Sequence, residues 1–167
     1  EYPVKVTMTR EDDISLSDQL ESVHKMKEDD LKKRKEMIEK EDADLTISIH
    51  LNSYPSDASV YGAQVFYAIG KQKRTGDKSC EQLSKKYGEN IQKSLETNIK
   101  DGRERSSMAK LDTYLLKNVH TPYVLVECGF LSNGRELERL QQESYQRQVA
   151  WSIYMVIETY LNAGSEN

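Results

Sequence analysis

One glutamate interrupts the most apolar segment of the sequence. Residues 123–126 are continuously apolar, and Glu127 follows them directly. A buried carboxylate without a partner is costly, and its pKa rises until it takes up a proton. Such a group is typical of a metal site or of a site of proton transfer. The alternatives are an edge position in the sheet, or a carboxylate that accepts hydrogen bonds from loop amides. We interpret Glu127 as a candidate catalytic residue.

His50 is the second candidate, because it ends a stretch in which apolar and polar residues alternate from Leu45 to Leu51. A strand fixes the direction of an imidazole at its end, which suits a metal ligand. A structural histidine that only forms hydrogen bonds is the alternative. His24 and His120 lie in polar segments, without a second His or Cys at a recurrent ligand spacing, and are expected on the surface. These residues alone do not assemble a complete zinc site.

Cys128 offers a different chemistry, a thiol nucleophile activated by His50. The neighbouring Glu127 opposes this reading, since a like charge raises the pKa of a thiol and the thiolate is the reactive form. Buried cysteines in strands are usually inert. A cysteine hydrolase therefore remains as an alternative to metal chemistry.

Both candidate residues stand at the ends of predicted strands. Alternating or continuously apolar residues predict strands over 4–8, 45–51, 62–68 and 123–130. Spacings of three and four between apolar residues predict helices over 77–99 and 145–161. Further helices are expected over 29–41 and after Asn133. Asn133 would cap the latter helix, and Glu136 would be its partner in a capping box. We expect loops over 10–28, 52–59 and 71–76, whereas 111–119 fits a strand or a short helix.

This alternation predicts an α/β fold, a three-layer sandwich with a mixed, mainly parallel sheet flanked by helices. Ligands bind beyond the strand ends in such sheets. The strand ends that carry His50 and Glu127 are therefore the expected site.

The long helix predicted over 77–99 contains Gly88, and a glycine inside a helix lowers its stability by about 1 kcal/mol relative to alanine.

Length and composition exclude several classes of protein. The chain has 167 residues, 19.3 kDa and a net charge of −4, which fits one domain over residues 1–167. No apolar run approaches the roughly 18 residues that span a bilayer. The basic cluster at 32–35 is flanked by acidic residues, so nucleic acid is not an expected partner. Two cysteines form neither a disulfide framework nor a four-cysteine zinc site. Arg103 and Arg105 could contact an anionic substrate group or lie in a solvated loop.

Three segments, taken in order, resemble a known family. They are Thr-Ile-Ser-Ile-His-Leu-Asn-Ser at 46–53, Gly-Ala-Gln-Val-Phe-Tyr at 62–67, and the stretch 122–133 that contains Glu-Cys-Gly-Phe-Leu-Ser-Asn. Met-Thr-Arg at 8–10 and Ala-Asp-Leu at 43–45 accompany them. In combination they resemble the zinc-dependent N-acetylmuramoyl-L-alanine amidases, which cut peptidoglycan, over nearly the whole chain. The resemblance is greatest to the sporulation branch, which prepares spore cortex for germination.

The resemblance implies roles for both site residues. His50 matches a Zn²⁺ ligand, and Glu127 matches the catalytic glutamate. The family takes two further ligands, a His and a Glu, from an upstream segment without a counterpart here. We therefore expect the 167 residues to be a fragment that lacks the family's first β-α unit and is inactive alone. The implied reaction is hydrolysis of the amide between N-acetylmuramic acid and L-alanine, in which zinc would acidify water and Glu127 would transfer the proton.

The resemblance also implies a setting and partners. It implies a peptidoglycan substrate, an extracytoplasmic location (secreted or associated with the cell wall) and, as in several members, an activator protein. The alternative is a catalytically impaired relative that binds the wall or a partner, which the missing ligands favour and the retained His50 and Glu127 oppose. The reading as a metal-dependent hydrolase requires these two side chains to meet, so a separation above about 12 Å would refute it.

Overall fold

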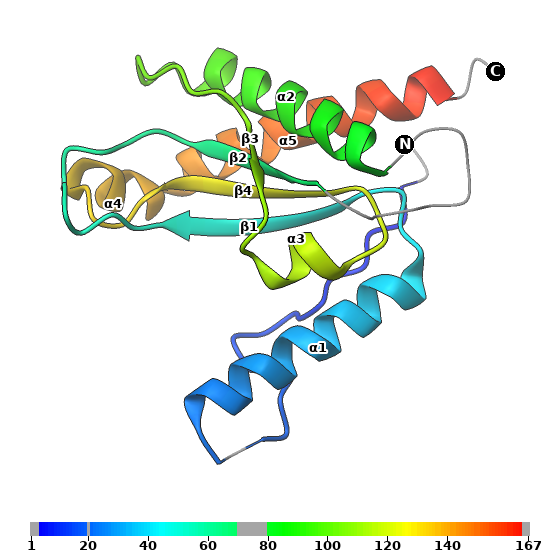
Figure 1. The fold of residues 1–167 in the computed structure, drawn as a ribbon. Helices are drawn as coiled ribbons and strands as arrows, with labels where there is room; N and C mark the ends of the chain where they lie inside the picture. The colour runs from blue at the N-terminus through cyan, green and yellow to red at the C-terminus, as the bar shows by residue number, and fades with distance from the viewer. Residues whose placement is uncertain (1–3, 20, 70–79, 165–167) are drawn as a thin grey trace.

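The computed structural model describes residues 4–19, 21–69 and 80–164, and among these four strands form one sheet (Figure 1). The strands are β1 (Thr46–Asn52), β2 (Gln64–Ala68), β3 (Met108–Lys110) and β4 (Tyr123–Phe130), in the order β1-β4-β2-β3. β1 runs parallel to β4, β3 runs parallel to β2, and β2 is antiparallel to β4. The predicted mixed, mainly parallel sheet is confirmed.

Helices cover both faces of this sheet (Figure 1). The long helices α2 (Cys80–Ile99) and α5 (Glu143–Gly164) pack on one face, and α1 (Val23–Glu41) and α3 (Tyr114–Asn118) lie on the other. A short helix, α4 (Gly134–Leu140), follows β4. The three-layer sandwich is therefore confirmed, and the ambiguous segment 111–119 contains a helix. The predicted loop over 71–76 and the predicted helical start at 77–79 lie outside the described residues.

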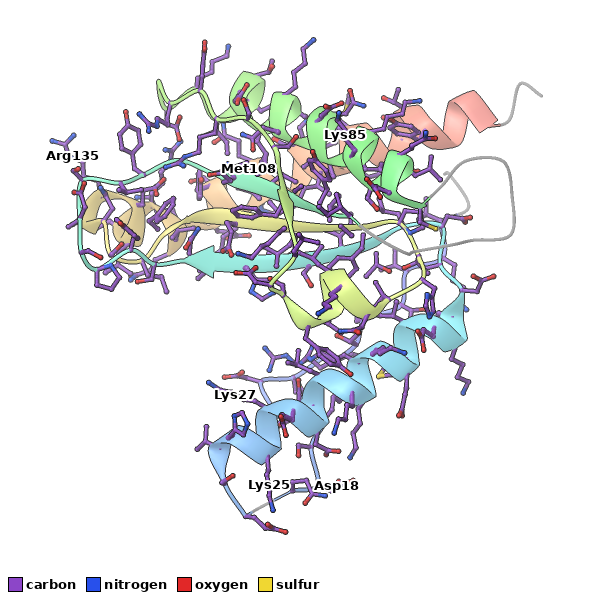
Figure 2. The ribbon with its side chains drawn as sticks, viewed as in Figure 1. Asp18, Lys25, Lys27, Lys85, Met108 and Arg135 are labelled. Atoms are coloured by element: carbon purple, nitrogen blue, oxygen red, sulfur yellow. The ribbon has the colours of Figure 1, made fainter. Side chains whose placement is uncertain are left out.

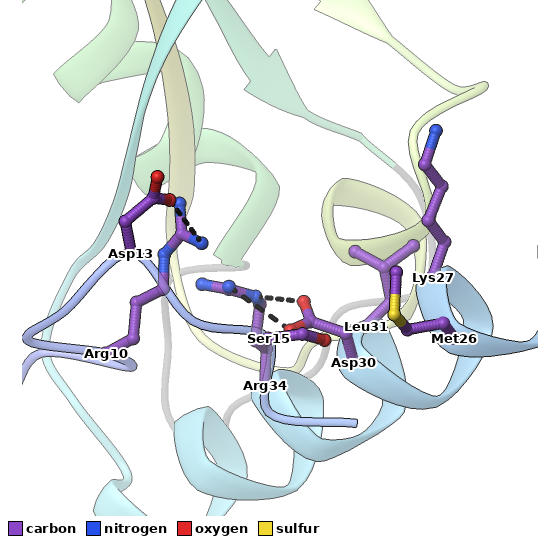
Figure 3. A pocket seen from close by; sticks show the side chains of 8 residues that line it. All are labelled: Arg10, Asp13, Ser15, Met26, Lys27, Asp30, Leu31 and Arg34. Carbon is purple, nitrogen blue, oxygen red and sulfur yellow. Dashed lines mark hydrogen bonds and ion pairs between the residues drawn. The ribbon is translucent and has the colours of Figure 1, made fainter. Parts of the chain in front are cut away.

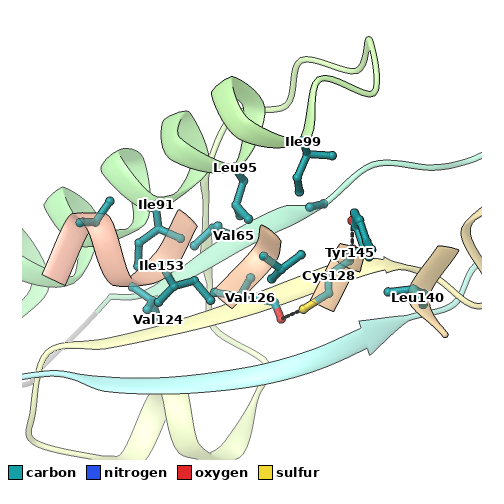
Figure 4. Close-up of a cluster of buried hydrophobic side chains, with 13 residues drawn as sticks. Val65, Ile91, Leu95, Ile99, Val124, Val126, Cys128, Leu140, Tyr145 and Ile153 are labelled. Atoms are coloured by element: carbon teal, nitrogen blue, oxygen red, sulfur yellow. Dashed lines mark hydrogen bonds between the residues drawn. The ribbon is translucent and has the colours of Figure 1, made fainter. Parts of the chain in front are cut away.

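Apolar side chains on the two faces of β4 explain why its sequence is continuously apolar. Val124 and Val126 pack with Ile91 and Leu95 of α2 in the larger core cluster, together with residues of α5 (Figure 4). Tyr123, the preceding residue, points to the other face, into the smaller cluster beneath α1 and α3. A strand that is covered on both faces needs apolar residues at successive positions. No helix in the described parts of the chain is long and apolar enough to cross a membrane.

The prediction of a strand over residues 4–8 is wrong. Val4, Val6 and Met8 alternate as expected, yet all three side chains are exposed and the segment has no regular structure. It is tied to α1 by polar contacts, in which the Lys5 ammonium donates to Glu41 at 2.6 Å. Alternation shows which residues could share a face, but a strand also needs a partner strand for its backbone groups. The segment pairs with none within the described residues.

The first helix begins six residues earlier than predicted. Ser22 caps α1, and its hydroxyl accepts a hydrogen bond from the Lys25 amide at 3.2 Å. Asp29 and Asp30, the predicted capping residues, lie inside the helix and accept hydrogen bonds from the preceding loop, including one from the Leu16 amide to Asp30 at 2.8 Å. These carboxylates therefore hold the loop onto the helix instead of starting it.

Candidate active site

The pairing of β1 with β4 brings His50 and Glu127 side by side. The two residues are direct partners in the parallel register, and neighbouring strands lie about 4.8 Å apart. Residues that are opposite each other in a sheet present their side chains on the same face. The two candidate residues, distant in the sequence, therefore meet near the C-terminal ends of adjacent strands, which is the arrangement that the metal-dependent reading required.

The surroundings of Glu127 do not match either structural alternative. β4 has a partner strand on each side, so Glu127 does not lie at an edge of the sheet. Its Oε2 atom is buried and has no hydrogen-bond partner among the described residues. Burial raises the pKa of Glu127, and the nearby charge of Lys110 opposes this rise in part. A half-buried carboxylate with a free oxygen is suited to receive a proton.

His50 differs from Glu127 in its exposure, since one side of the residue is open to solvent. The protein packed against its other side lowers the pKa of the imidazole, and the positive charge of Arg34 on α1 lowers this pKa further. Both effects favour the neutral imidazole, which is the form that binds a metal. The position at a strand end fixes the direction in which the ring extends.

Gln64 extends the pair to a row of three, and sequence reasoning missed it. Gln64 of β2 is the direct partner of Glu127 on the side opposite His50. Its amide oxygen accepts a hydrogen bond from Arg105 Nη1 at 2.8 Å, and its amide nitrogen donates to the Ser106 carbonyl at 2.8 Å. Both ends of the Gln64 amide are therefore fixed. The available signal was a polar residue within an otherwise apolar strand.

Arg105 holds this side of the site in place. Its guanidinium donates to the Tyr61 carbonyl from Nε at 3.0 Å and from Nη2 at 2.6 Å, and it lies over the ring of Phe130 at 5.1 Å. Neither sequence reading of Arg105, a free anion contact or a solvated side chain, describes this role. Arg103 lies over the Tyr61 ring at 5.8 Å.

Lys110 supplies a positive charge beside the row, and sequence reasoning missed it as well. Its ammonium lies 4.8 Å from the centre of the Phe66 ring and 3.2 Å from Asp112. This charge favours the ionised form of Glu127. A carboxylate that must accept a proton benefits from such a neighbour, because the ionised form is the basic one.

A second buried carboxylate secures the end of β4. Glu136 is 4% exposed, and its Oε2 accepts a hydrogen bond from the Phe130 amide at 2.7 Å. The carboxylate can approach closely because residue 129 is glycine, where a Cβ atom would lie 3.2 Å from Glu136 Oε1. Asn133 caps α4 as predicted, by accepting from the Glu136 amide at 3.2 Å. The predicted return bond of a capping box does not form, since the Glu136 side chain binds Phe130.

The thiol alternative is contradicted by the environment of Cys128. Burial raises the pKa of this thiol to about 12, and the charge of Glu127 contributes to the rise. Cys128 belongs to the core cluster beneath α2 and α5, on the face opposite the side chain of His50. A thiol that stays protonated and points away from the imidazole is not an activated nucleophile.

The remaining histidines lie on the surface, as predicted. His24 is in α1, not in a loop, and its Nε2 lies 3.4 Å from Glu28. His120 is exposed, 3.4 Å from Glu39. Within the described residues, no three His, Cys, Asp or Glu side chains cluster as a metal site. The imidazole of His50 fits the donor chemistry of zinc, but it is a single ligand.

A hollow of about 390 Å³ lies between residues 10–15 and α1 (Figure 3). Its charges largely neutralise each other, since Arg34 pairs with Asp30 at 2.6 Å and Arg10 with Asp13 at 3.6 Å. Arg34 also donates to Thr9 at 2.8 Å. The contacts with Asp30 and Thr9 fix the position of Arg34, whose positive charge lowers the pKa of His50.

Comparison with known proteins shows the family of the chain. Residues 1–159 match the family model described as N-acetylmuramoyl-L-alanine amidase. The chain belongs to this amidase family. The germination-specific N-acetylmuramoyl-L-alanine amidase of Bacillus subtilis is 36% identical over 156 residues, which are 93% of this chain and 61% of that protein. The chain thus spans less than two thirds of the length of this relative.

Solved structures of amidases share the fold. The CwlD amidase of Clostridioides difficile, solved in complex with the GerS lipoprotein, has 38% sequence identity and a TM-score of 0.81, covering 93% of this chain and 74% of that one. The catalytic domain of the amidase CwlV from Paenibacillus polymyxa has 26% identity and a TM-score of 0.67, covering 96% and 75%. The amidases similar to this chain thus include a germination-specific member.

Proposed function

We propose that this chain carries part of the active site of a zinc-dependent amidase that hydrolyses the bond between N-acetylmuramic acid and L-alanine in peptidoglycan. The observation that supports this most is the register of β1 and β4, which sets His50 beside a carboxylate whose buried Oε2 has no partner among the described residues. Membership of the amidase family agrees with it.

His50 is the residue of this chain that would hold the metal, since burial and the charge of Arg34 lower the pKa of its imidazole and the ring extends from a strand end. When bound, zinc would polarise the amide carbonyl and acidify water. Structural and catalytic zinc sites use three or four protein ligands, and His50 supplies only one. We therefore propose that these 167 residues are inactive by themselves and form one domain of the amidase.

Glu127 would act as the general base and then as the general acid. Its free Oε2 takes a proton from the attacking water and delivers it to the leaving nitrogen of L-alanine. Lys110 favours the ionised, proton-accepting form at the start of this cycle. Gln64, fixed by Arg105, is uncharged and holds the neighbouring register position without adding a second negative charge beside Glu127.

The comparisons also support a form of peptidoglycan, a location and a protein partner for this amidase. The likeness to a germination-specific amidase and to CwlD supports spore cortex as the form of peptidoglycan and an extracytoplasmic location, secreted or associated with the wall. That the CwlD structure contains a lipoprotein supports an activator protein for this enzyme also.

The test is cleavage of a soluble muropeptide by the zinc-loaded full-length amidase, in which these 167 residues are joined to the segment that supplies the remaining metal ligands; we call this protein the full chain. We expect a new free amino group on L-alanine, detected by mass spectrometry, and loss of cleavage when a chelator removes the metal. Cleavage that survives complete metal removal would contradict the proposal. A protein that binds peptidoglycan and zinc yet never cleaves would instead be the catalytically impaired, wall-binding relative.

A further inference from the structure

A groove of about 550 Å³ runs along the outer surface of α2 and α5. These helices cover the face of the sheet opposite to the row of His50, Glu127 and Gln64. The groove is therefore separate from the candidate active site. Its volume lies within the roughly 300–1,000 Å³ that is usual for ligand sites.

An exposed aromatic side chain dominates the α5 wall of the groove. Trp151 is 55% exposed and lies 5.6 Å from the ring of Tyr154, in a tilted arrangement. Met155, one turn further on, is 37% exposed and also lines the groove. A tryptophan is costly to leave in water, and such residues are enriched where a partner covers them. Trp151 is thus the natural anchor for a ligand.

The α2 wall presents hydrogen-bond acceptors. Asn90 donates from Nδ2 to the Tyr160 hydroxyl at 2.9 Å and to the Lys86 carbonyl at 2.8 Å, and Asn98 donates to the Ser94 carbonyl at 2.9 Å. These internal bonds occupy the donor ends of both amides. The amide oxygens remain available, and within the described residues they accept no side-chain or backbone hydrogen bond, so the wall favours a ligand rich in donors.

The charges of the groove are positive, although the whole chain has a net charge of −4. Lys86 and Lys93 line it, and no carboxylate of the described residues does. Neither lysine forms an ion pair with the described part of the chain, and the Lys86 ammonium lies 4.7 Å from the centre of the Tyr160 ring. The groove therefore complements a ligand that carries carboxylates.

We propose that this groove binds a strand of peptidoglycan at a distance from the bond that is cut. The apolar face of a sugar ring stacks on Trp151, the hydroxyl and acetamido N–H groups donate to the oxygens of Asn90 and Asn98, and a carboxylate of a peptide stem pairs with Lys93. This proposal rests on the proposed function, since it assumes the same polymer. It adds a surface that would hold the polymer while another part of it occupies the active site.

The lining favours a glycan over a protein helix. A helix that docks in a groove inserts apolar side chains spaced three and four residues apart, which needs a continuous apolar floor. Here small polar residues of α2 occupy most of one wall. These polar residues face an α5 wall that carries the rings of Trp151 and Tyr160, and this combination matches the mixed apolar and hydroxyl surface of a sugar instead.

The experiment measures sedimentation of the full chain with purified insoluble peptidoglycan, in a Glu127→Gln background so that the polymer is not digested. Trp151→Ala and Lys93→Glu each remove one contact. Lys85→Glu is the matched control, since Lys85 makes the same charge change on α2 but does not line the groove (Figure 2). Trp151→Phe tests whether an aromatic ring restores binding, and thermal melting confirms that each variant is folded.

We expect each groove variant to weaken binding by at least about fivefold, the loss usual for an important contact residue, with Lys85→Glu unchanged and Trp151→Phe close to wild type. The proposal would be overturned if both groove variants bound peptidoglycan as well as the wild type does. It would also be overturned if the variants still bound peptidoglycan but no longer bound a protein partner. Failure of the proposed function is measured separately, as absence of muropeptide cleavage by the unmodified, zinc-loaded protein.

Discussion

Glu127→Gln separates a catalytic carboxylate from a structural one, because the two roles predict opposite results. General acid–base catalysis contributes about 10²–10⁴ in rate, so we expect the glutamine variant of the zinc-loaded full chain to lose at least about a hundredfold in kcat. A hundredfold loss corresponds to about 2.7 kcal/mol of barrier. Zinc content should stay unchanged, because the proposed metal ligand in this chain is His50.

The stability of the same variant provides the second measurement. Burial raises the pKa of Glu127, so the folded chain binds this proton more tightly than the unfolded chain does. The contribution of Glu127 to the free energy of unfolding is therefore favourable below the unfolded pKa and is lost as pH rises through the folded value. Glutamine carries no charge, so at pH 7 we expect a melting temperature no lower than that of the wild type.

Glu136→Gln is the matched control, since it makes the same change at a buried carboxylate with a structural contact. Glu136 accepts the Phe130 amide at 2.7 Å, and a hydrogen bond to a charged group is worth about 1.5–3 kcal/mol. We expect this variant to melt about 3 °C lower or more. If Glu127→Gln instead lowered the melting temperature in this way and kept near-normal turnover, the catalytic reading of Glu127 would be refuted.

Three further results are expected from the remaining features. His50→Ala should lower the zinc content of the full chain, measured by metal analysis, whereas the surface variant His120→Ala should keep it, and equal zinc in both would remove His50 from the metal site. Because Cys80 and Cys128 are buried and the pKa of Cys128 is about 12, neither thiol should react rapidly with a disulfide reagent at pH 8, and both should react after denaturation. A fast-reacting thiol in the folded protein would revive the cysteine alternative. Leu95→Ala, at a side chain that is 1% exposed, should cost about 2–5 kcal/mol in a denaturant titration, and a smaller loss would mean that the core collapses around it.

The sequence predicted those helices and strands in which the pattern of apolar residues matches the faces that are buried in the structure. The apolar run over 123–126 predicted a strand covered on both faces, and β4 is such a strand, with core clusters on each side. The spacing of three and four over 80–99 predicted α2. In these segments one local property, the periodicity of apolar residues, determines both the element and the face that it buries.

Other features depended on contacts that a sequence does not display. The alternation at 4–8 has no partner strand among the described residues, and the carboxylates of Asp29 and Asp30 bind a loop instead of capping a helix. The place of Gly88 in a helix is explained only by its neighbour, since a Cβ there would lie 3.1 Å from the Tyr67 ring.

For the candidate site, the sequence identified the two residues that interrupt or end an apolar pattern, His50 and Glu127. It did not identify Gln64 or Lys110, because their relevance depends on the order of the strands. β2, which carries Gln64, lies next to β4 as its antiparallel partner. β3, which carries Lys110, lies on the far side of β2 from β4. Without the order of the strands, neither side chain could be placed beside the carboxylate.

The register between β1 and β4 also governs when the site can exist during folding. Side chains alternate between the two faces of a strand, so a slip of one residue would turn His50 into the core and leave Glu127 alone. The pairing joins distant parts of the chain, and such contacts form slowly because a long loop must close first. In the proposed function, capture of the metal by His50 would therefore be a late event in folding, and a partly folded molecule would not have the complete pair of residues.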